Sequence, residues 1–181
     1  MDAFIALGSN LGDRVGNLRE GLRRLAERDL PPAALSSVWE TEPVDSLGSP
    51  WFLNLVMRAS TSRGPLEVLD LLLEVEREVG RVRSRRNAPR VLDLDLLLLG
   101  DARCEDPRLV LPHPRMWGRR FVMEPLAEIA PGLRDPSTGS TAREICRSLR
   151  GPFQVRRWGV LVATGAGSGI IPVSGGENSQ A

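Results

Sequence analysis

The stretch Arg90-Val91-Leu92-Asp93-Leu94-Asp95-Leu96-Leu97-Leu98-Leu99 governs how the rest of the chain is interpreted, because it places two acidic residues inside a run of leucines. Residues two apart on a strand point to the same face, so Asp93 and Asp95 present their carboxylates side by side. The alternate leucines face the other way, into a core: Leu92, Leu94, Leu96 and Leu98. The stretch predicts a strand with one apolar face and one face that carries a carboxylate pair.

Two carboxylates this close repel each other unless a cation lies between them. Oxygen ligands suit a hard cation, and Mg²⁺ typically uses one or two carboxylates together with waters and substrate phosphates. The pair on its own leaves a second interpretation open, in which Asp93 and Asp95 simply reach solvent at a sheet edge.

The segment just before the strand is rich in arginine and has no apolar periodicity. Its basic residues are Arg81, Arg83, Arg85, Arg86 and Arg90. A solvated charge run is one interpretation of such a segment. Guanidinium groups also match phosphate oxygens bidentately. Next to a carboxylate pair, these arginines predict a site for a metal-bound polyphosphate.

Composition limits the function classes. The chain has 181 residues, 41% of them hydrophobic, which suits one globular domain with a sizeable core. A net charge of +1 argues against a general nucleic-acid or membrane-surface binder. All 24 basic residues are Arg, so no lysine nucleophile or P-loop lysine is available. Cys104 and Cys146 fit no metal or redox spacing, and the N-terminus has no signal-peptide pattern, so we expect a monomeric cytoplasmic protein with free thiols.

Hydrophobic periodicity predicts an α+β protein with a ferredoxin-like βαββαβ sheet and both helices on one face. The expected order is a strand over 3–7, a helix over 14–28, strands over 35–41 and 52–61, a helix from Pro65 to Gly80, and the Asp93 strand. Asp13 is the expected N-cap of the first helix. The sheet face away from the helices is expected to be free and to carry Phe52 and Asn54 beside the two carboxylates.

The C-terminal part is expected to add short helices and a strand. Prolines bracket the only histidine, His113, which either donates to a phosphate oxygen or serves only to order this loop. Thr141-x-x-Glu144 is a capping box that opens a short helix. The last predicted strand is 153–162. Residues 1–162 are thus expected to form one domain, and the Gly/Ser-rich residues 163–181 a flexible tail.

Several motifs, taken in order, resemble the hydroxymethyldihydropterin pyrophosphokinase family of folate biosynthesis. The resemblance runs from about Ala3 to about Leu149. It rests on Ala6-Leu7-Gly8-Ser9-Asn10-Leu11-Gly12, Thr41-Glu42-Pro43-Val44, Phe52-Leu53-Asn54, the arginine and Asp-x-Asp segment from Gly80 to Asp95, Leu111-Pro112-His113-Pro114, and Arg119-x-Phe121 followed by Pro125 to Pro131. Each short motif alone is weak, but the long arginine and Asp-x-Asp motif is specific.

The resemblance implies transfer of pyrophosphate from ATP to the hydroxymethyl oxygen of 6-hydroxymethyl-7,8-dihydropterin, with release of AMP. It implies two Mg²⁺ ions on Asp93 and Asp95, which with Arg81 and Arg90 would form the catalytic set. It assigns nucleotide binding to Glu76, Arg83, Arg86, Leu96, Arg108, His113 and Arg119. It places the pterin between Phe52 and Phe121, with its polar edge read by Thr41, Pro43, Val44 and Asn54. The expected partners are therefore ATP and a pterin, with no nucleic acid and no membrane.

The chain departs from the family pattern at Asn87-Ala88, where the family usually has Trp-Gly, with the tryptophan in the lid that closes over the nucleotide. Two other functions share part of this sequence pattern. A metal-dependent nucleotide-sugar transferase also uses Asp-x-Asp, although this chain has no nucleotide-binding βαβ half. An RNA-recognition module shares the βαββαβ order, but carboxylates on its exposed face would repel RNA.

Overall fold

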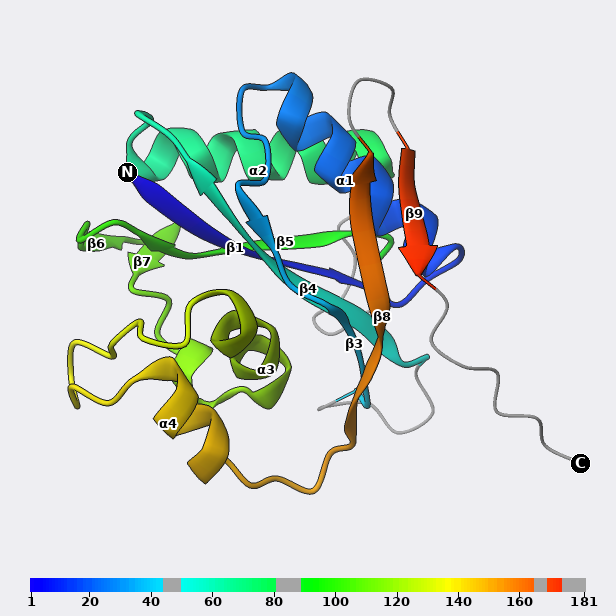
Figure 1. The fold of residues 1–181 in the computed structure, drawn as a ribbon. Coiled ribbons are helices and arrows are strands. Elements are labelled where there is room, and N and C mark those ends of the chain that lie inside the picture. The colour runs from blue at the N-terminus through cyan, green and yellow to red at the C-terminus, as the bar shows by residue number, and fades with distance from the viewer. Residues whose placement is uncertain (44–49, 81–88, 165–168, 174–181) are drawn as a thin grey trace, which may run out of the picture.

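The computed structural model describes residues 1–43, 50–80, 89–164 and 169–173. Its main sheet is antiparallel, and the ferredoxin-like part has the strand order β5-β1-β4-β3 (Figure 1). The strands are β1 (Asp2–Ser9), β2 (Ala34–Leu35), β3 (Val38–Thr41), β4 (Phe52–Ser60) and β5 (Asp93–Leu99). β2 and β3 both pair with β4 and replace the single strand predicted over 35–41. The α+β, ferredoxin-like prediction is confirmed.

Two helices cover one face of this sheet, α1 (Arg14–Glu27) and α2 (Pro65–Val79), as Figure 1 shows. Their ends lie where the sequence predicts them. The Asp13 carboxylate accepts the Gly16 N–H at 2.9 Å and caps α1. Pro65 opens α2, and Gly80 ends it with φ of +105°, in the left-handed region that suits glycine.

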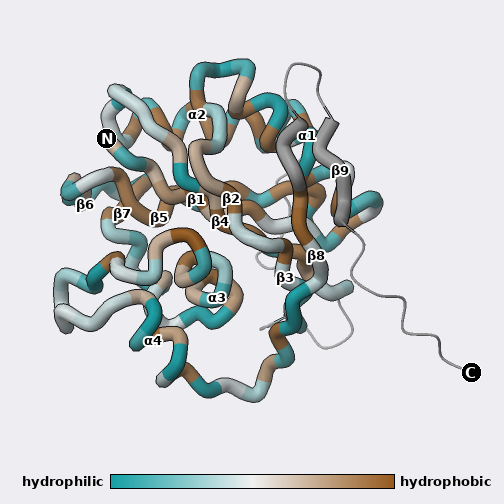
Figure 2. Tube along the Cα trace, viewed as in Figure 1, coloured by the Kyte–Doolittle hydropathy of each residue, from teal (hydrophilic) through white to brown (hydrophobic). Residues whose placement is uncertain are grey.

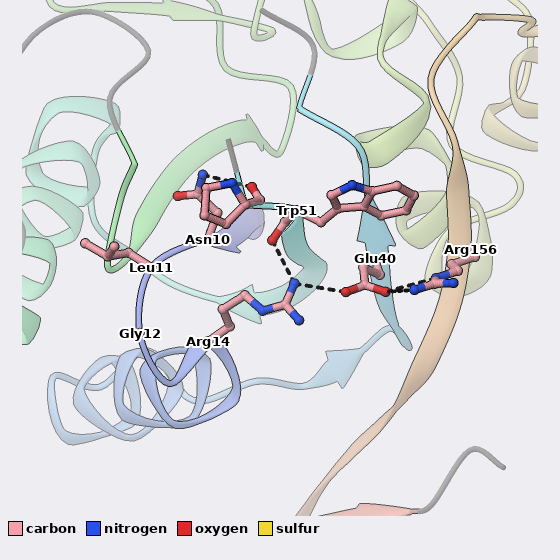
Figure 3. Close-up of a pocket in the computed structure, with 8 residues that line it drawn as sticks. Asn10, Leu11, Gly12, Arg14, Glu40, Trp51 and Arg156 are labelled. Atoms are coloured by element: carbon pink, nitrogen blue, oxygen red, sulfur yellow. Dashed lines mark hydrogen bonds and ion pairs between the residues drawn. The ribbon is translucent and has the colours of Figure 1, made fainter. Parts of the chain in front are cut away.

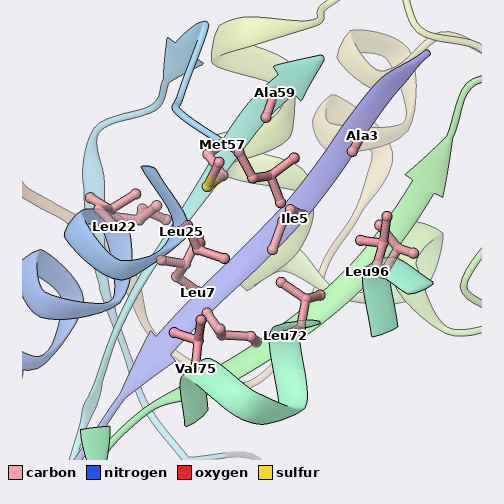
Figure 4. Packing of buried hydrophobic residues seen from close by; sticks show 14 of the residues in the cluster. Ala3, Ile5, Leu7, Leu22, Leu25, Met57, Ala59, Leu72, Val75 and Leu96 are labelled. Carbon is pink, nitrogen blue, oxygen red and sulfur yellow. The ribbon is translucent and has the colours of Figure 1, made fainter. Parts of the chain in front are cut away.

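The helix-side core lies between these helices and the sheet. Ile5 and Leu7 of β1 meet Leu22 and Leu25 of α1 and Leu72 of α2, all 1% exposed or less (Figure 4). Burial of a large aliphatic side chain contributes about 1.5–3 kcal/mol, so this layer supplies much of the driving force for folding. Figure 2 shows the same pattern along the chain, with apolar strands in the middle and polar segments outside.

The other sheet face is not free, contrary to the prediction. The helices α3 (Arg120–Ile129) and α4 (Ala142–Ser148) lie below it in Figure 1, and the 3₁₀ helix η1 (Met116–Gly118) directly precedes α3. They form a second core with the sheet, made of Phe4, Val56, Leu97, Leu98, Met116, Val122, Met123, Leu126 and Ala142. The Glu128 carboxylate of α3 also accepts the Ser37 N–H at 2.6 Å. The second core covers the Phe4 side of the face.

A β-bulge at Leu97 corrects the prediction that Leu98 shares a face with Leu92, Leu94 and Leu96. Phe4 pairs with Leu98 and Ile5 with Leu96, so Leu97 is one extra residue on β5. Beyond the bulge the alternation changes phase: Leu98 lies in the second core, and Leu99 in the helix-side core.

The C-terminal part adds elements that the sequence predicted only in part. A hairpin of β6 (Cys104–Asp106) and β7 (Leu109–Leu111) was not predicted. β8 (Val155–Thr164) corresponds to the strand predicted over 153–162, but it ends two residues beyond the expected boundary at 162. It pairs with β3. β9 (Gly169–Val173) pairs with β8, so five residues of the expected flexible tail form a strand instead. This segment contains the β-branched residues Ile170, Ile171 and Val173, which favour strands.

None of the helices in the described ranges is long and apolar enough to cross a membrane.

Candidate functional site

The two carboxylates lie on the sheet face opposite α1 and α2, beyond the part that the second core covers. Asp93 pairs with Gly8 of β1, and Asp95 pairs with Ala6. Both Asp residues are half-buried. These cross-strand neighbours carry little or no side chain. This donor set, two carboxylates on one sheet face, fits a hard cation that takes its other ligands from waters or phosphate oxygens.

Gly8 brings the predicted substrate residues next to the carboxylates. It pairs with Asp93 on one side and with Asn54 of β4 on the other. A Cβ atom at Gly8 would lie 2.8 Å from Asn54 Oδ1, 3.8 Å from Phe52 Cδ1 and 3.9 Å from Asp93 Cβ. The sequence motif that contains Gly8 did not by itself predict a role for this residue. The structure shows that Gly8 leaves the space that these three side chains surround.

The Asn54 amide is held by a neighbour. Its Nδ2 donates to Thr41 Oγ1 at 2.7 Å, and both residues are buried. With Nδ2 occupied in this way, Oδ1 remains on the Gly8 side. Thr41 and Phe52 are themselves cross-strand partners. The structure therefore brings Thr41, Phe52 and Asn54 together.

Arg90 and Asn10 fix the entrance to β5. Arg90 Nη1 forms an ion pair with Asp93 Oδ2. The Arg90 backbone donates to Asn10 Oδ1 at 2.7 Å and accepts the Asn10 N–H at 3.1 Å. Asn10 Nδ2 also donates to the Pro50 carbonyl at 3.3 Å. Asn10 thus joins the segment before β5 to the segment before β4, a role that was not predicted and that its place within the Ala6 to Gly12 motif could have suggested.

Several predicted site residues lie outside the described residues: Val44, Arg81, Arg83 and Arg86, together with Arg85 and the Asn87-Ala88 departure. Pro43 is described and partly exposed, at the end of β3.

His113 lies beside β5 in a basic environment. Its backbone N–H donates to the Leu97 carbonyl at 2.9 Å, and its ring Nδ1 accepts the Arg115 N–H at 3.2 Å. The pKa of His113 lies below its usual value because burial and the charges of Arg119 and Arg115 disfavour the imidazolium. The ring is therefore neutral at pH 7, and its proton is assigned to Nε2, which can donate to an anion.

Arg119 and Phe121 flank the start of α3. The Arg119 guanidinium carbon lies 5.4 Å from the centroid of the Phe121 ring. Phe121 is partly exposed and packs against the second core, and Phe52 is also partly exposed. Both aromatic residues therefore have ring surface available, although part of Phe121 serves the core.

Three predicted nucleotide-binding residues make contacts within the protein. Glu76 is 1% exposed, and its carboxylate accepts the Leu94 N–H at 2.7 Å, which fixes the backbone between the two Asp residues. Leu96 is 3% exposed in the helix-side core, so only its backbone could contact a nucleotide. Arg108, in the β6–β7 turn, is exposed and pairs with Asp70 of α2 at 3.0 Å.

A cavity of about 510 Å³ lies apart from this cluster. Its lining includes Asn10, Arg14, Glu40, Trp51 and Arg156 (Figure 3). Glu40 lies between Trp39 and Thr41 on β3, so its side chain points to the helix side of the sheet, away from the Asn54 face. Asn10, one of the lining residues, also contacts Arg90 of the candidate site.

The comparisons with known proteins agree with this geometry. The model of the 7,8-dihydro-6-hydroxymethylpterin-pyrophosphokinase (HPPK) family matches residues 4–131, well over half of the chain. The chain belongs to the HPPK family. The match contains β1 to α3 and therefore every element that surrounds the Gly8 space.

Individual HPPK relatives cover different shares of the chain. A Bacillus subtilis 2-amino-4-hydroxy-6-hydroxymethyldihydropteridine pyrophosphokinase is 41% identical over 139 residues, 76% of this chain and 83% of the relative. The mitochondrial folate synthesis bifunctional protein of Arabidopsis thaliana is 40% identical over 153 residues, 84% of this chain. This chain spans only 28% of that bifunctional protein's length.

Solved HPPK structures share the fold. A crystal structure of HPPK-DHPS in complex with substrates superposes with a TM-score of 0.65 and 14% sequence identity. The superposition covers 95% of this chain and 48% of the solved chain. At this identity the likeness supports the HPPK fold, and the roles of individual residues have to be argued from their contacts in this chain.

Proposed function

We propose that this chain transfers the pyrophosphoryl group of ATP to the hydroxymethyl oxygen of 6-hydroxymethyl-7,8-dihydropterin. The observation that carries the proposal is the convergence at Gly8 of a carboxylate from β5 with Asn54 and Phe52 of β4. The arrangement supports the proposal because a carboxylate, which could hold a cation, lies beside an amide and an aromatic ring, and these suit the polar edge and the flat face of a pterin. The names of the HPPK-family relatives support the same substrate.

In the proposed reaction the substrate hydroxyl oxygen attacks the β-phosphorus of ATP. A new O–P bond forms, the bond between the β-phosphorus and the oxygen that bridges to the α-phosphate breaks, AMP leaves, and the hydroxyl proton is released to water. Such transfers depend mainly on positioning and charge neutralisation. Asn54 would orient the pterin, and neutral His113 would donate from Nε2 to a phosphate oxygen.

Asp93 and Asp95 would hold two Mg²⁺ ions, as the resemblance implies. When bound, Mg²⁺ neutralises charge on the phosphates and aligns the reacting oxygens. Because Asp93 is already paired with Arg90, occupation of this site would release the Arg90 guanidinium toward the phosphates. Glu76 would keep the Leu94 backbone in place between the two carboxylates.

The proposal also includes the environment of the protein. We propose that the chain acts as a monomer in the cytoplasm, where Cys104 and Cys146 would stay as the free thiols that the structure shows. Sedimentation at working concentration tests the monomer, and a second species at twice the mass would contradict it.

Measurement of AMP formation from ATP, with and without the hydroxymethyl pterin, tests the activity. We expect AMP only when both the pterin and Mg²⁺ are present. Asp95→Asn should keep the fold but lower kcat by about 10²–10³-fold, the usual cost of one charge-stabilising contact. Asp101→Asn is the matched control, because Asp101 is exposed just after the same strand and should keep full activity. Wild-type-like turnover of Asp95→Asn at limiting Mg²⁺ would remove the metal assignment.

A further inference from the structure

One buried carboxylate on the back of β3 is shared by two arginines. Glu40 is 7% exposed. Its Oε1 accepts a hydrogen bond from Arg14 Nη1 of α1 at 3.0 Å, and its Oε2 accepts two from Arg156 of β8, at 2.9 Å from Nε and 2.6 Å from Nη2 (Figure 3). Glu40 therefore connects α1, β3 and β8.

The same two arginines also hold Trp51, the residue before β4. Arg14 Nη1 donates to the Trp51 carbonyl at 2.7 Å, and the Arg156 guanidinium carbon lies 5.2 Å from the Trp51 ring centroid. Trp51 is thus fixed at its backbone and at its ring. Arg14 connects the segment that leads into β4 directly to the Glu40 carboxylate.

The electrostatics of this group favour a charged Glu40. Burial alone would raise the pKa of the carboxyl, but hydrogen bonds from Arg156 and Arg14, and their charges, more than offset it and leave the pKa below the usual value. A neutral side chain at position 40 would therefore leave Arg14 with a weaker partner in a half-buried position.

The position of the group in the sheet links it to the candidate pterin site. Glu40 directly precedes Thr41, and Trp51 directly precedes Phe52. Thr41 and Phe52 are cross-strand partners whose side chains point to the opposite face, where Thr41 accepts the Asn54 hydrogen bond. The contacts among Glu40, Arg14, Arg156 and Trp51 lie on the helix side of the sheet. They therefore fix the backbone that orients the Thr41 and Phe52 side chains toward the site on the other side.

We propose that Glu40 is a positioning residue for the pterin, acting through Thr41 and Phe52, an inference that rests on the proposed function. The carboxylate does not touch the substrate. It sets the alignment of the ends of β3 and β4, and through them the position of Thr41 Oγ1, the Asn54 amide and the Phe52 ring. Its loss weakens pterin binding and leaves the nucleotide side of the site, on β5, unchanged.

Steady-state kinetics of Glu40→Gln test this inference. We expect the KM for the pterin to rise by about tenfold, which corresponds to about 1.4 kcal/mol. The KM for ATP and kcat at saturating pterin should change by less than about twofold, since an effect on binding alone raises KM without lowering kcat. A purely structural role would lower the melting temperature without this split.

Glu78→Gln is the matched control. The Glu78 carboxylate of α2 is also shared by two arginines, Arg24 and Arg28, but it lies on the helix surface away from the sheet. This variant should keep all three kinetic constants. If Glu40→Gln does not fold, Arg156→Met replaces it, because Arg156 is 68% exposed and its removal leaves Glu40 paired with Arg14. We expect a rise in the pterin KM of a few-fold in Arg156→Met.

The outcomes separate the two proposals. An active wild-type chain whose Glu40→Gln and Arg156→Met variants keep the wild-type pterin KM overturns the positioning role alone. An equal rise in both KM values, or a rise in Glu78→Gln as well, also overturns it, because the effect would then be a general loss of stability. A wild-type chain that forms no AMP with pterin, ATP and Mg²⁺ overturns the proposed function, and the positioning role with it.

Discussion

His113 is a neutral donor whose protonation is set by its neighbours. Burial and the charges of Arg119 and Arg115 lower its pKa below the usual 6.5. Because the chain has one histidine, a proton NMR titration reports this ring alone. We expect a midpoint below pH 6.5 in the free protein, and a higher midpoint in Arg119→Gln, which removes one nearby positive charge.

Bound polyphosphate should also raise the titration midpoint of His113, since negative charge favours the imidazolium. Addition of Mg²⁺ and a non-hydrolysable ATP analogue should therefore raise the His113 midpoint. An unchanged midpoint with saturating analogue would mean that His113 serves only to order its proline-rich loop, the other interpretation of its sequence context.

Gly8 is the second residue whose role is specific. In Gly8→Ala the new Cβ would lie 2.8 Å from Asn54 Oδ1, so the amide must move. We expect a rise in the pterin KM of about tenfold, equivalent to the loss of one or two hydrogen bonds, with a change in melting temperature of only a few degrees.

Gly21→Ala provides the comparison for Gly8→Ala. Its Cβ would also meet an atom at 2.8 Å, but that atom is Leu92 Cδ2, the flexible end of a core side chain on the helix side. Gly21→Ala should change the melting temperature and leave the pterin KM unchanged. A pterin KM that responds equally to both substitutions would show that the Gly8 space is not part of the pterin site.

At the scale of elements, the sequence predicted what local chemistry determines. The caps at Asp13, Gly80 and Thr141 depend on side chains and backbone angles within a few residues, and all three are present. Alternation within β4 also placed Phe52 and Asn54 on one face, whereas the hydrogen bond from Asn54 to Thr41 depends on the register between β4 and β3.

The features that the sequence did not predict depend on residues far away in the chain. The Leu97 bulge is defined by the pairing of β5 with β1, more than 90 residues earlier, so alternation within β5 gives no sign of it. The docking of α3 over the sheet likewise depends on contacts such as Glu128 to Ser37, which span 91 residues. The predicted free face was wrong for this reason.

At the scale of the whole molecule, acid should destabilise the fold through a set of paired carboxylates. The pKa of Glu20 is lowered to about 2, mainly by a hydrogen bond from Arg23 and, against the effect of burial, by Arg24. The pKa values of Glu40, Glu78 and Glu144 are lowered too. A carboxylate with a lowered folded-state pKa stabilises the fold fully above its unfolded value of about 4.5 and loses that contribution as the pH falls.

We therefore expect the melting temperature to be nearly constant from pH 7 to about 5 with respect to these groups, and to fall steadily between about pH 4.5 and 2. Glu20→Gln should reduce the slope of that fall. Calorimetry across this range provides the measurement, and an equal slope in Glu20→Gln would show that the Glu20 pairs with Arg23 and Arg24 contribute nothing to the acid transition.

The pairing of the C-terminal strands predicts how deletions from the C-terminus affect stability. β8 pairs with β3 over residues 155–159 and with β9 over residues 160–164. Deletion of residues 165–181 therefore leaves the β3 pairing and Arg156 in place, and should change the melting temperature by a few degrees at most. Deletion of residues 153–181 removes Arg156 and the buried Leu161, and should lower the melting temperature further and raise the pterin KM.

Because Leu97 forms a bulge, the number of residues in β5 matters at this position. Without Leu97 the ladder would be regular: Leu96 and Leu99 would stay on the helix side, Leu98 on the other side, and the two Asp residues in place. The backbone N–H of His113 would, however, lose the Leu97 carbonyl that it contacts at 2.9 Å. Leu97→Ala keeps that carbonyl and loses only side-chain packing, at a cost of about 2–5 kcal/mol.

A one-residue deletion and a substitution at the same position should therefore have separable effects. Loss of the Leu97 codon is expected to weaken binding of an ATP analogue more than Leu97→Ala does, even if the two variants melt at the same temperature. Titration calorimetry measures both. Either length of β5 keeps both Asp residues on one face, and Leu97 decides only whether the histidine-bearing loop stays attached to the strand that carries the carboxylates.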